Sequence, residues 1–185
     1  MKLPDPDLRD YYEFEKARMF FVDEEITVSM HYLTKAIMRF NYEDRDLPIE
    51  DRKPIKLFID SPGGDLDVTL SLINVIKMSK TPIWTINLCA CFSGAALLLM
   101  AGHKRFAIKN TKVLIHSGSG YVGGTFEAAE AHMDNYKSSI EDMRNFILDN
   151  TKIEAKMLKK KQDKEWYLGV QDMIDRIQGE GGFES

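Results

Sequence analysis

Short apolar runs alternate along the chain with longer apolar or amphipathic stretches. The short runs predict strands at residues 18–22, 55–59, 82–87, 104–107 and 112–115. The longer stretches predict helices at residues 27–40, 67–78, 93–101, 125–149 and 153–161. Strands that alternate with helices indicate an α/β domain with a largely parallel sheet.

The same pattern divides the chain. Residues 1–17 carry acidic residues and two prolines, so we expect a flexible or adapting arm and no secretory leader. Residues 18–177 are predicted to form one domain, followed by a flexible tail at 178–185. The apolar stretch 83–101 is interpreted as a buried strand and a buried helix, although its length approaches that of a membrane span. We therefore expect a soluble, cytoplasmic protein with no membrane partner.

Composition narrows the class of function. The formal net charge of −4 argues against nucleic-acid binding, which requires a basic face. The two cysteines, Cys89 and Cys91, cannot build a four-ligand zinc site alone. A strand would point both to the same side, so we interpret them as buried small side chains in a reducing compartment.

Three local features are candidates for chemistry. The turn DSPGGD follows the strand at 55–59, and its glycines allow backbone N–H groups to approach a ligand. Ser93-Gly94 stands where a buried strand meets a buried helix, as a nucleophile does in other hydrolases. Taken alone, that stretch favours a helix-capping serine instead.

His116 ends the strand at 112–115 and precedes the glycine-rich run SGSGYVGG. A histidine at this end of a strand is well placed to line a crevice in an open α/β sheet. His31, His103 and His132 are given a structural interpretation. Thr125 is predicted to cap the long helix that follows.

The combination resembles the proteolytic-subunit family of the Clp protease (ClpP), within the crotonase-like superfamily. The resemblance runs from Arg18 to Ile177 and rests on RMFFV, IDSPGGD, TINLCACFSGAALLLMAG and VLIHSGSGYVGGTFEAAE. It implies a ClpP/crotonase-like fold of repeated β-β-α units with a protruding handle in the region 117–150. It places the catalytic serine at Ser93 and the catalytic histidine at His116.

The chain departs from the family pattern around both residues. CACFSGA replaces the usual Gly-x-Ala-Ala-Ser-Met-Gly, and His116-Ser117-Gly118 replaces His-Gln-Pro. The acidic residue is the least defined member of the catalytic triad that the resemblance implies. Alignment of WYLGVQDM without gaps puts Glu165 at the position of the family's Asp, and Asp163 two residues upstream is the alternative.

The resemblance implies serine endopeptidase chemistry with no metal or organic cofactor. It places the oxyanion hole at the backbone N–H groups of Gly64 and Gly94. The strand that pairs with an unfolded substrate would comprise Gly120, Tyr121, Val122, Gly123 and Gly124. It also implies stacked heptameric rings that are fed by a hexameric AAA+ unfoldase.

Three alternatives stay open. A catalytically inactive ring subunit would fit the unusual acid, although Ser93 and His116 are both present. A crotonase-like acyl-CoA enzyme would share the two oxyanion N–H groups without needing the Ser/His pair. A signal-peptide-peptidase-like protein would require a membrane anchor and a lysine base.

Overall fold

The computed structural model describes residues 6–118, 124–161 and 164–177. At its centre is a six-stranded sheet in which β1, β2, β3, β5 and β6 lie in that order, while β4 pairs with the first half of β3. All neighbouring strands run parallel except β5 and β6. The strands are β1 (Met19–Val22), β2 (Ile55–Ser61), β3 (Ile83–Phe92), β4 (Lys104–Ala107), β5 (Lys112–Ile115) and β6 (Trp166–Leu168).

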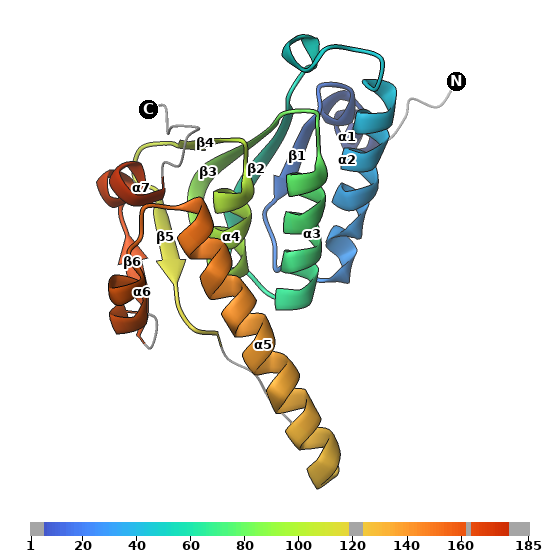
Figure 1. Cartoon of the computed structure of the whole chain (residues 1–185). Helices are drawn as coiled ribbons and strands as arrows, with labels where there is room; N and C mark the ends of the chain where they lie inside the picture. Colours follow the sequence, from blue (N-terminus) through green and yellow to red (C-terminus); the bar gives the residue numbers. More distant parts are fainter. Residues whose placement is uncertain (1–5, 119–123, 162–163, 178–185) are drawn as a thin grey trace.

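The helices α2, α3 and α4 cover one face of this sheet, and the long helix α5 protrudes from it (Figure 1). The helices are α1 (Pro6–Lys16), α2 (His31–Glu43), α3 (Leu66–Met78), α4 (Gly94–Ala101), α5 (Phe126–Asn150), α6 (Ala155–Lys161) and α7 (Val170–Ile177). Two 3-10 turns, η1 (Val28–Met30) and η2 (Ile49–Asp51), complete the set among the described residues. The α/β class and the protruding long helix are confirmed.

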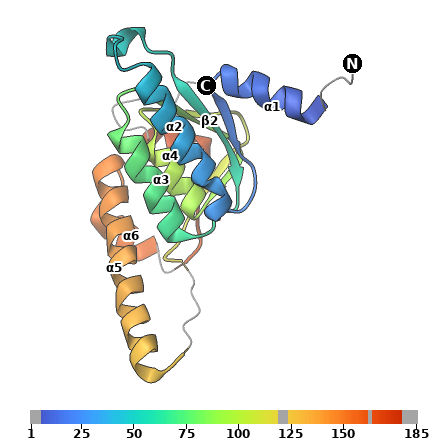
Figure 2. The same ribbon diagram turned by 90° about the vertical axis from the view of Figure 1, so that its right-hand side faces the viewer.

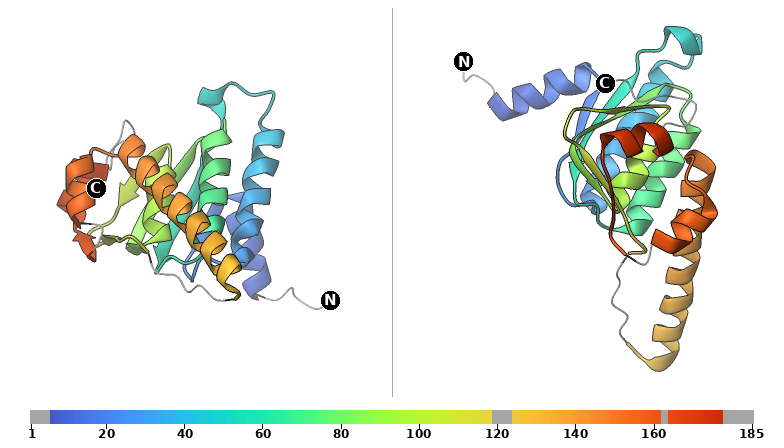
Figure 3. Two further views of the ribbon diagram at one scale, coloured as in Figure 1. Left: turned by 60° about the horizontal axis from the view of Figure 1, so that its bottom comes forward. Right: turned by 90° about the vertical axis from the view of Figure 1, so that its left-hand side faces the viewer.

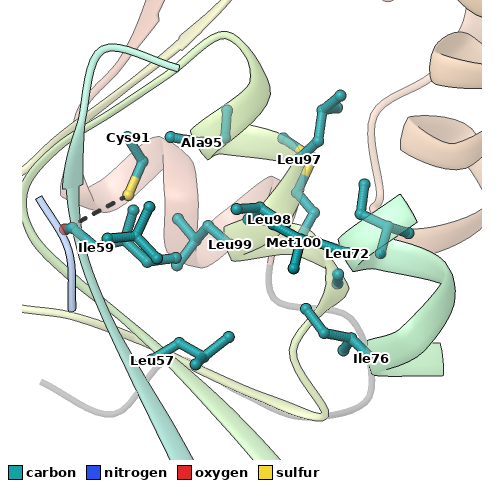
Figure 4. Packing of buried hydrophobic residues seen from close by; sticks show 14 of the residues in the cluster. Leu57, Ile59, Leu72, Ile76, Cys91, Ala95, Leu97, Leu98, Leu99 and Met100 are labelled. Carbon is teal, nitrogen blue, oxygen red and sulfur yellow. Dashed lines mark hydrogen bonds between the residues drawn. The ribbon is translucent and has the colours of Figure 1, made fainter. Parts of the chain in front are cut away.

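The core centres on α4, which is apolar around its whole circumference and has every residue buried. A helix of this composition is stable only when other elements surround it. Figure 4 shows its leucines and Met100 packed against Leu57 and Ile59 of β2 and against Leu72 of α3. Because α4 is packed on all sides, Ser93, which immediately precedes it, is held in place.

Residues 6–16, within the predicted flexible arm, form the helix α1, which extends from the sheet on the side away from α2 and α3 (Figure 2). An ion pair of 2.5 Å joins Glu15 to Arg39 of α2. The Phe14 ring lies edge-on to Phe21 of β1 at 5.2 Å between centroids. The predicted tail 178–185 lies outside the described residues.

The expectation that both cysteines are buried is wrong for one of them. Cys91 is fully buried, whereas Cys89 is exposed. Ile59 pairs with Asn87 and Ser61 with Cys91, so two residues of β2 span four of β3. This bulge breaks the alternation of sides that would have turned both thiols inward.

The helix predicted at 27–40 also differs at its start. Residues 28–30 form η1, and α2 begins at His31. Val28 and Tyr32, which the apolar pattern places on the buried face, are 70% and 38% exposed. Within the described part of the chain, no helix is long and apolar enough to span a bilayer.

Candidate active site

Three loops leave the carboxyl ends of neighbouring parallel strands at one edge of the sheet. Gly63 and Gly64 follow β2, Ser93 follows β3, and His116 follows β5. Open α/β sheets bind their ligands at this edge. All four residues line one cavity of about 1190 Å³, whose far wall is formed by α5. The structure thus brings together residues that are more than 50 positions apart in the chain.

Ser93 occupies a strained turn between β3 and α4. Its φ of 53° and ψ of −121° lie outside the regions that a non-glycine residue favours. The turn is held because the Ser93 N–H donates to the Leu114 carbonyl at 2.9 Å and its carbonyl accepts from the Ala96 N–H at 3.0 Å. The hydroxyl makes no capping hydrogen bond to the described residues of α4, so the helix-cap interpretation is wrong. The geometry is that of a nucleophile elbow.

Glycine is required where the β2 loop meets this turn. Gly63 has a φ of +92°, and a Cβ atom there would lie 2.4 Å from the Phe92 carbonyl oxygen and 2.9 Å from the Gly94 nitrogen. Gly64 has a φ of +152°, and a Cβ atom would lie 2.2 Å from the Ile26 carbonyl oxygen. A side chain at Gly63 would push the β2 loop away from the serine turn, and a side chain at Gly64 would push it away from Ile26.

Two backbone N–H groups at this contact are available to a ligand. Ile26 donates to the Gly63 carbonyl at 2.7 Å and accepts from the Asp65 N–H at 2.8 Å, so the Gly64 N–H takes no part in that bridge. Gly94 is the first residue of α4, and its N–H has no acceptor within the helix. Donors beside a serine hydroxyl at a helix N-terminus can stabilise an oxyanion.

His116 is half-buried and faces the same cavity. Its Nδ1 atom accepts a hydrogen bond from the Gly118 N–H at 3.3 Å. Ser93 and His116, both among the described residues, are not hydrogen-bonded to each other. In free enzymes such catalytic contacts are often longer than in the substrate complex.

Glu165 immediately precedes β6, which pairs antiparallel with β5. Trp166 lies opposite Ile115, so one further step of the register puts Glu165 opposite His116. The carboxylate nevertheless accepts a hydrogen bond from the Tyr167 hydroxyl at 3.1 Å, and this bond raises the pKa of Tyr167. Glu165 is exposed and is not among the residues that line the cavity. Asp163, the alternative acid, lies outside the described residues.

The predicted substrate-pairing strand is only partly visible. Gly124, with a φ of +117°, is described, whereas Gly120, Tyr121, Val122 and Gly123 lie outside the described residues. Thr125 next to it accepts a hydrogen bond from the Ala128 N–H at 3.3 Å, which confirms the predicted cap of α5.

Sequence reasoning missed the contribution of α5 to the cavity wall. His132, Tyr136, Ile140 and Met143 line it, although His132 had been given a purely structural interpretation. The sequence shows that α5 is a helix but not which side of the sheet edge it covers. His103 does have a structural contact, since its Nδ1 accepts from the Ile83 N–H at 2.9 Å.

Comparison with known proteins identifies the fold that carries this site. A family model described as Clp protease matches residues 8–176. The chain belongs to the Clp protease family.

Curated Clp protease relatives show how divergent this member is. The chain is 25% identical over 167 residues to proteolytic subunit 2 of the ATP-dependent Clp protease of Treponema pallidum, covering 89% of this chain and 81% of that subunit. It is 29% identical over 125 residues to proteolytic subunit 2 of Treponema denticola, covering 66% of this chain and 62% of the relative. The chain is 29% identical over 161 residues to proteolytic subunit 1 of the ATP-dependent Clp protease of Rhodopirellula baltica, covering 83% of this chain and 66% of that subunit.

The Clp protease match contains all three loops of the cavity and the whole of α5. The strained serine turn, the Gly63-Gly64 turn and His116 therefore all lie within the matched range of the Clp protease family model. Among the described residues, no group of three histidine, cysteine or acidic side chains is placed to hold a metal ion.

Proposed function

We propose that this Clp protease family member is a serine endopeptidase that hydrolyses unfolded polypeptides or peptides. The observation that carries the proposal is the strained backbone of Ser93, which presents a hydroxyl that caps no helix to the cavity that His116 also lines. A non-glycine residue at positive φ has an energetic cost of about 1–3 kcal/mol, and such strain is concentrated at functional sites.

In the proposed reaction, the Ser93 Oγ attacks the scissile carbonyl and His116 Nε2 takes its proton. His116 returns that proton to the leaving amine, and a water molecule then hydrolyses the acyl-enzyme by the same route. The N–H groups of Gly64 and Gly94 stabilise the oxyanion. Loss of one such donor typically raises the barrier by roughly 2.7–4 kcal/mol.

Glu165 is the proposed third member, and the register of β5 with β6 supports it over Asp163. In antiparallel pairs, directly opposite residues have Cβ atoms about 4.5–5.5 Å apart. A rotation of the Glu165 side chain away from Tyr167 would bring its carboxylate toward the His116 ring. There it would orient the imidazole and stabilise its positive form.

The assembly is likewise proposed. The segment 120–124 would bind an extended substrate as an added strand, reading its backbone more than its sequence. The protruding α5 would interdigitate between stacked rings of seven copies, and a Clp-type AAA+ unfoldase would feed the chamber. Relatives named as subunits of an ATP-dependent Clp protease support this arrangement.

A fluorophosphonate or β-lactone probe tests the activity directly. We expect mass spectrometry to locate the adduct on Ser93, with labelling lost in Ser93→Ala and His116→Ala. Ser117→Ala is the matched control because it removes a hydroxyl next to His116, and it should still be labelled. Failure of the intact oligomer to react would favour an inactive structural subunit. Binding of coenzyme A without labelling would favour the acyl-CoA class.

The acid is tested by comparing two isosteric variants. Glu165→Gln should lower the peptidase rate about 10⁴-fold if it acts as the triad acid does in serine proteases, whereas Asp163→Asn should retain activity. A fully active Glu165→Gln enzyme would refute the assignment to Glu165.

The inactive-subunit alternative has one specific observation in its favour. Glu165 bonds to Tyr167 and His116 bonds to Gly118, so acid and base are each engaged elsewhere in this structure.

A further inference from the structure

The imidazole of His116 has a hydrogen-bond partner on the wrong nitrogen for catalysis. Its Nδ1 accepts from the Gly118 N–H at 3.3 Å, and an accepting nitrogen carries no proton. The neutral ring therefore has its proton on Nε2. A base that removes the Ser93 proton needs the opposite tautomer, with a free lone pair on Nε2 and a proton on Nδ1 that the acid can accept.

We propose that Gly118 and Tyr136 are positioning residues that hold His116 in this tautomer, whose Nε2 cannot accept the Ser93 proton, until the turn at 117–118 is displaced. The inference rests on the proposed function of His116. The Nδ1–H tautomer lacks the lone pair that the Gly118 N–H binds, so the contact disfavours the tautomer that catalysis needs. Glu165 and the Gly118 N–H thus compete for the same side of the ring.

Tyr136 lies close against Gly118. A Cβ atom on Gly118 would be 2.7 Å from the Tyr136 hydroxyl oxygen and 3.6 Å from the Ile140 Cδ1, so α5 lies directly against this turn. The φ of +85° at Gly118 is one that residues with a side chain rarely adopt. The orientation of the Gly118 N–H therefore depends on the position of α5 beside the turn. The N-terminal part of this helix projects away from the sheet (Figure 3).

The change of tautomer at His116 needs only water to carry protons and no other reactant. The turn moves so that the Gly118 N–H leaves Nδ1, the Nε2 proton passes to water, and Nδ1 takes a proton from water. The carboxylate of Glu165 exchanges the Tyr167 hydroxyl for the new Nδ1–H. Ser93 Oγ can then donate to the freed Nε2 lone pair.

Imidazole ¹⁵N NMR of the full-length protein tests the tautomer without any turnover. We expect the His116 signals, assigned by comparison with His116→Gln, to show Nδ1 unprotonated and Nε2 protonated in the resting protein. Resonances of the Nδ1–H tautomer in the resting protein would overturn the inference. If the tautomer is as expected but neither the wild type nor the Gly118→Pro/Tyr136→Phe variant is labelled, the proposed function alone is overturned.

A pair of variants then links the contact to reactivity. Gly118→Pro with Tyr136→Phe removes the N–H donor and also the hydroxyl that a proline ring would strike. Because proline fixes φ at about −65°, this variant also displaces the turn from the φ of +85° at Gly118. Its matched control is Gly118→Asn with Tyr136→Phe, since asparagine keeps the N–H and tolerates positive φ. We expect the proline pair to populate the Nδ1–H form and to label about fivefold faster, the factor that one net hydrogen bond carries. Equal tautomer populations in the two pairs would contradict the role of Gly118.

Discussion

A Cβ atom on Gly63 would lie 2.8 Å from the Cβ of Ser93, closer than side-chain atoms approach one another. The turn after β2 and the turn after β3 are therefore packed together at their backbones. The contact fixes how the Gly64 and Gly94 N–H groups lie relative to the Ser93 hydroxyl. Geometry around the candidate nucleophile depends on the absence of one methyl group.

Gly63→Ala should consequently disrupt the site. The new Cβ meets the Phe92 carbonyl oxygen at 2.4 Å, and alanine is strained at a φ of +92°. We expect a loss of about 1–3 kcal/mol in the free energy of unfolding, measured with urea, and loss of probe labelling at Ser93. Gly169→Ala is the control, because a Cβ there has no neighbour within 4 Å. Unchanged unfolding and labelling of Gly63→Ala would show that the two turns are not closely packed.

The ion pair between Arg18 and Asp44 should be a major contributor to stability. Two guanidinium nitrogens donate to the carboxylate at 2.6 and 2.7 Å, the Thr81 hydroxyl donates at 3.0 Å, and both charged side chains are largely buried. Asp44→Asn should lower the free energy of unfolding by about 3 kcal/mol, because it leaves a buried guanidinium without its counter-charge. Asp46→Asn, which disturbs an exposed pair with Arg45, should change it by less than about 1 kcal/mol.

The ion pair between Arg18 and Asp44 also determines how the free energy of unfolding changes at acid pH. Arg18 holds the pKa of Asp44 below its ordinary value of 3.8. The unfolded chain therefore takes up the Asp44 proton first, and the stability that the pair contributes is lost as the pH falls below 3.8. The difference in unfolding free energy between wild type and Asp44→Asn should shrink over this range in urea titrations.

His103 should give the free energy of unfolding a weaker pH dependence, closer to neutral pH. Partial burial lowers its pKa from 6.5 while its Nδ1 accepts the Ile83 N–H. The unfolded chain binds the proton more readily, so stability falls as the pH drops below 6.5 and levels off below the folded pKa. The slope should stay well under the ~1.4 kcal/mol per pH unit of a full proton, because the ring is partly exposed. His103→Gln should flatten this dependence of stability on pH, and an unchanged slope in His103→Gln would contradict the assignment.

Arg105 connects three helix ends and should be costly to replace. Its guanidinium donates to the carbonyls of Gly102, Asn150 and Ile177, which end α4, α5 and α7, at 3.2, 2.7 and 2.6 Å. Burial lowers its pKa to about 10. Arg105→Met should reduce the free energy of unfolding by about 3 kcal/mol, and Arg105→Lys should recover part of this loss. A neutral result for Arg105→Met would mean that water replaces the guanidinium at these carbonyls.

Strands whose ends are visible in the local sequence were predicted well. Strand segments that form only because they pair with a distant strand were not predicted. β4 and β5 have the predicted bounds, because the turn at Lys109-Asn110 separates them. β3 continues five residues beyond the predicted end at Asn87, since Ala90–Phe92 pair with β5. The three-residue β6 exists through pairing with β5 and was missed.

At the site, the sequence identified the loops but not their mutual geometry. Ser93 and His116 share a cavity as expected. The bulge that exposes Cys89 and the hydrogen bond that occupies His116 Nδ1 arise from contacts between distant segments. No local pattern of residues encodes such contacts, and the same holds for the cavity wall that α5 provides.

The buried residues of α5, Ile140, Met143 and Ile147, all lie in its C-terminal half. The preceding half, residues 126–139, rises about 20 Å at 1.5 Å per residue and carries Tyr136 and His132 on the cavity side. A helix that is held by buried side chains in one half only behaves as a lever. A rotation of α5 about Ile147 would displace Phe126 more than Tyr136, because Phe126 lies farther from that buried residue along the helix.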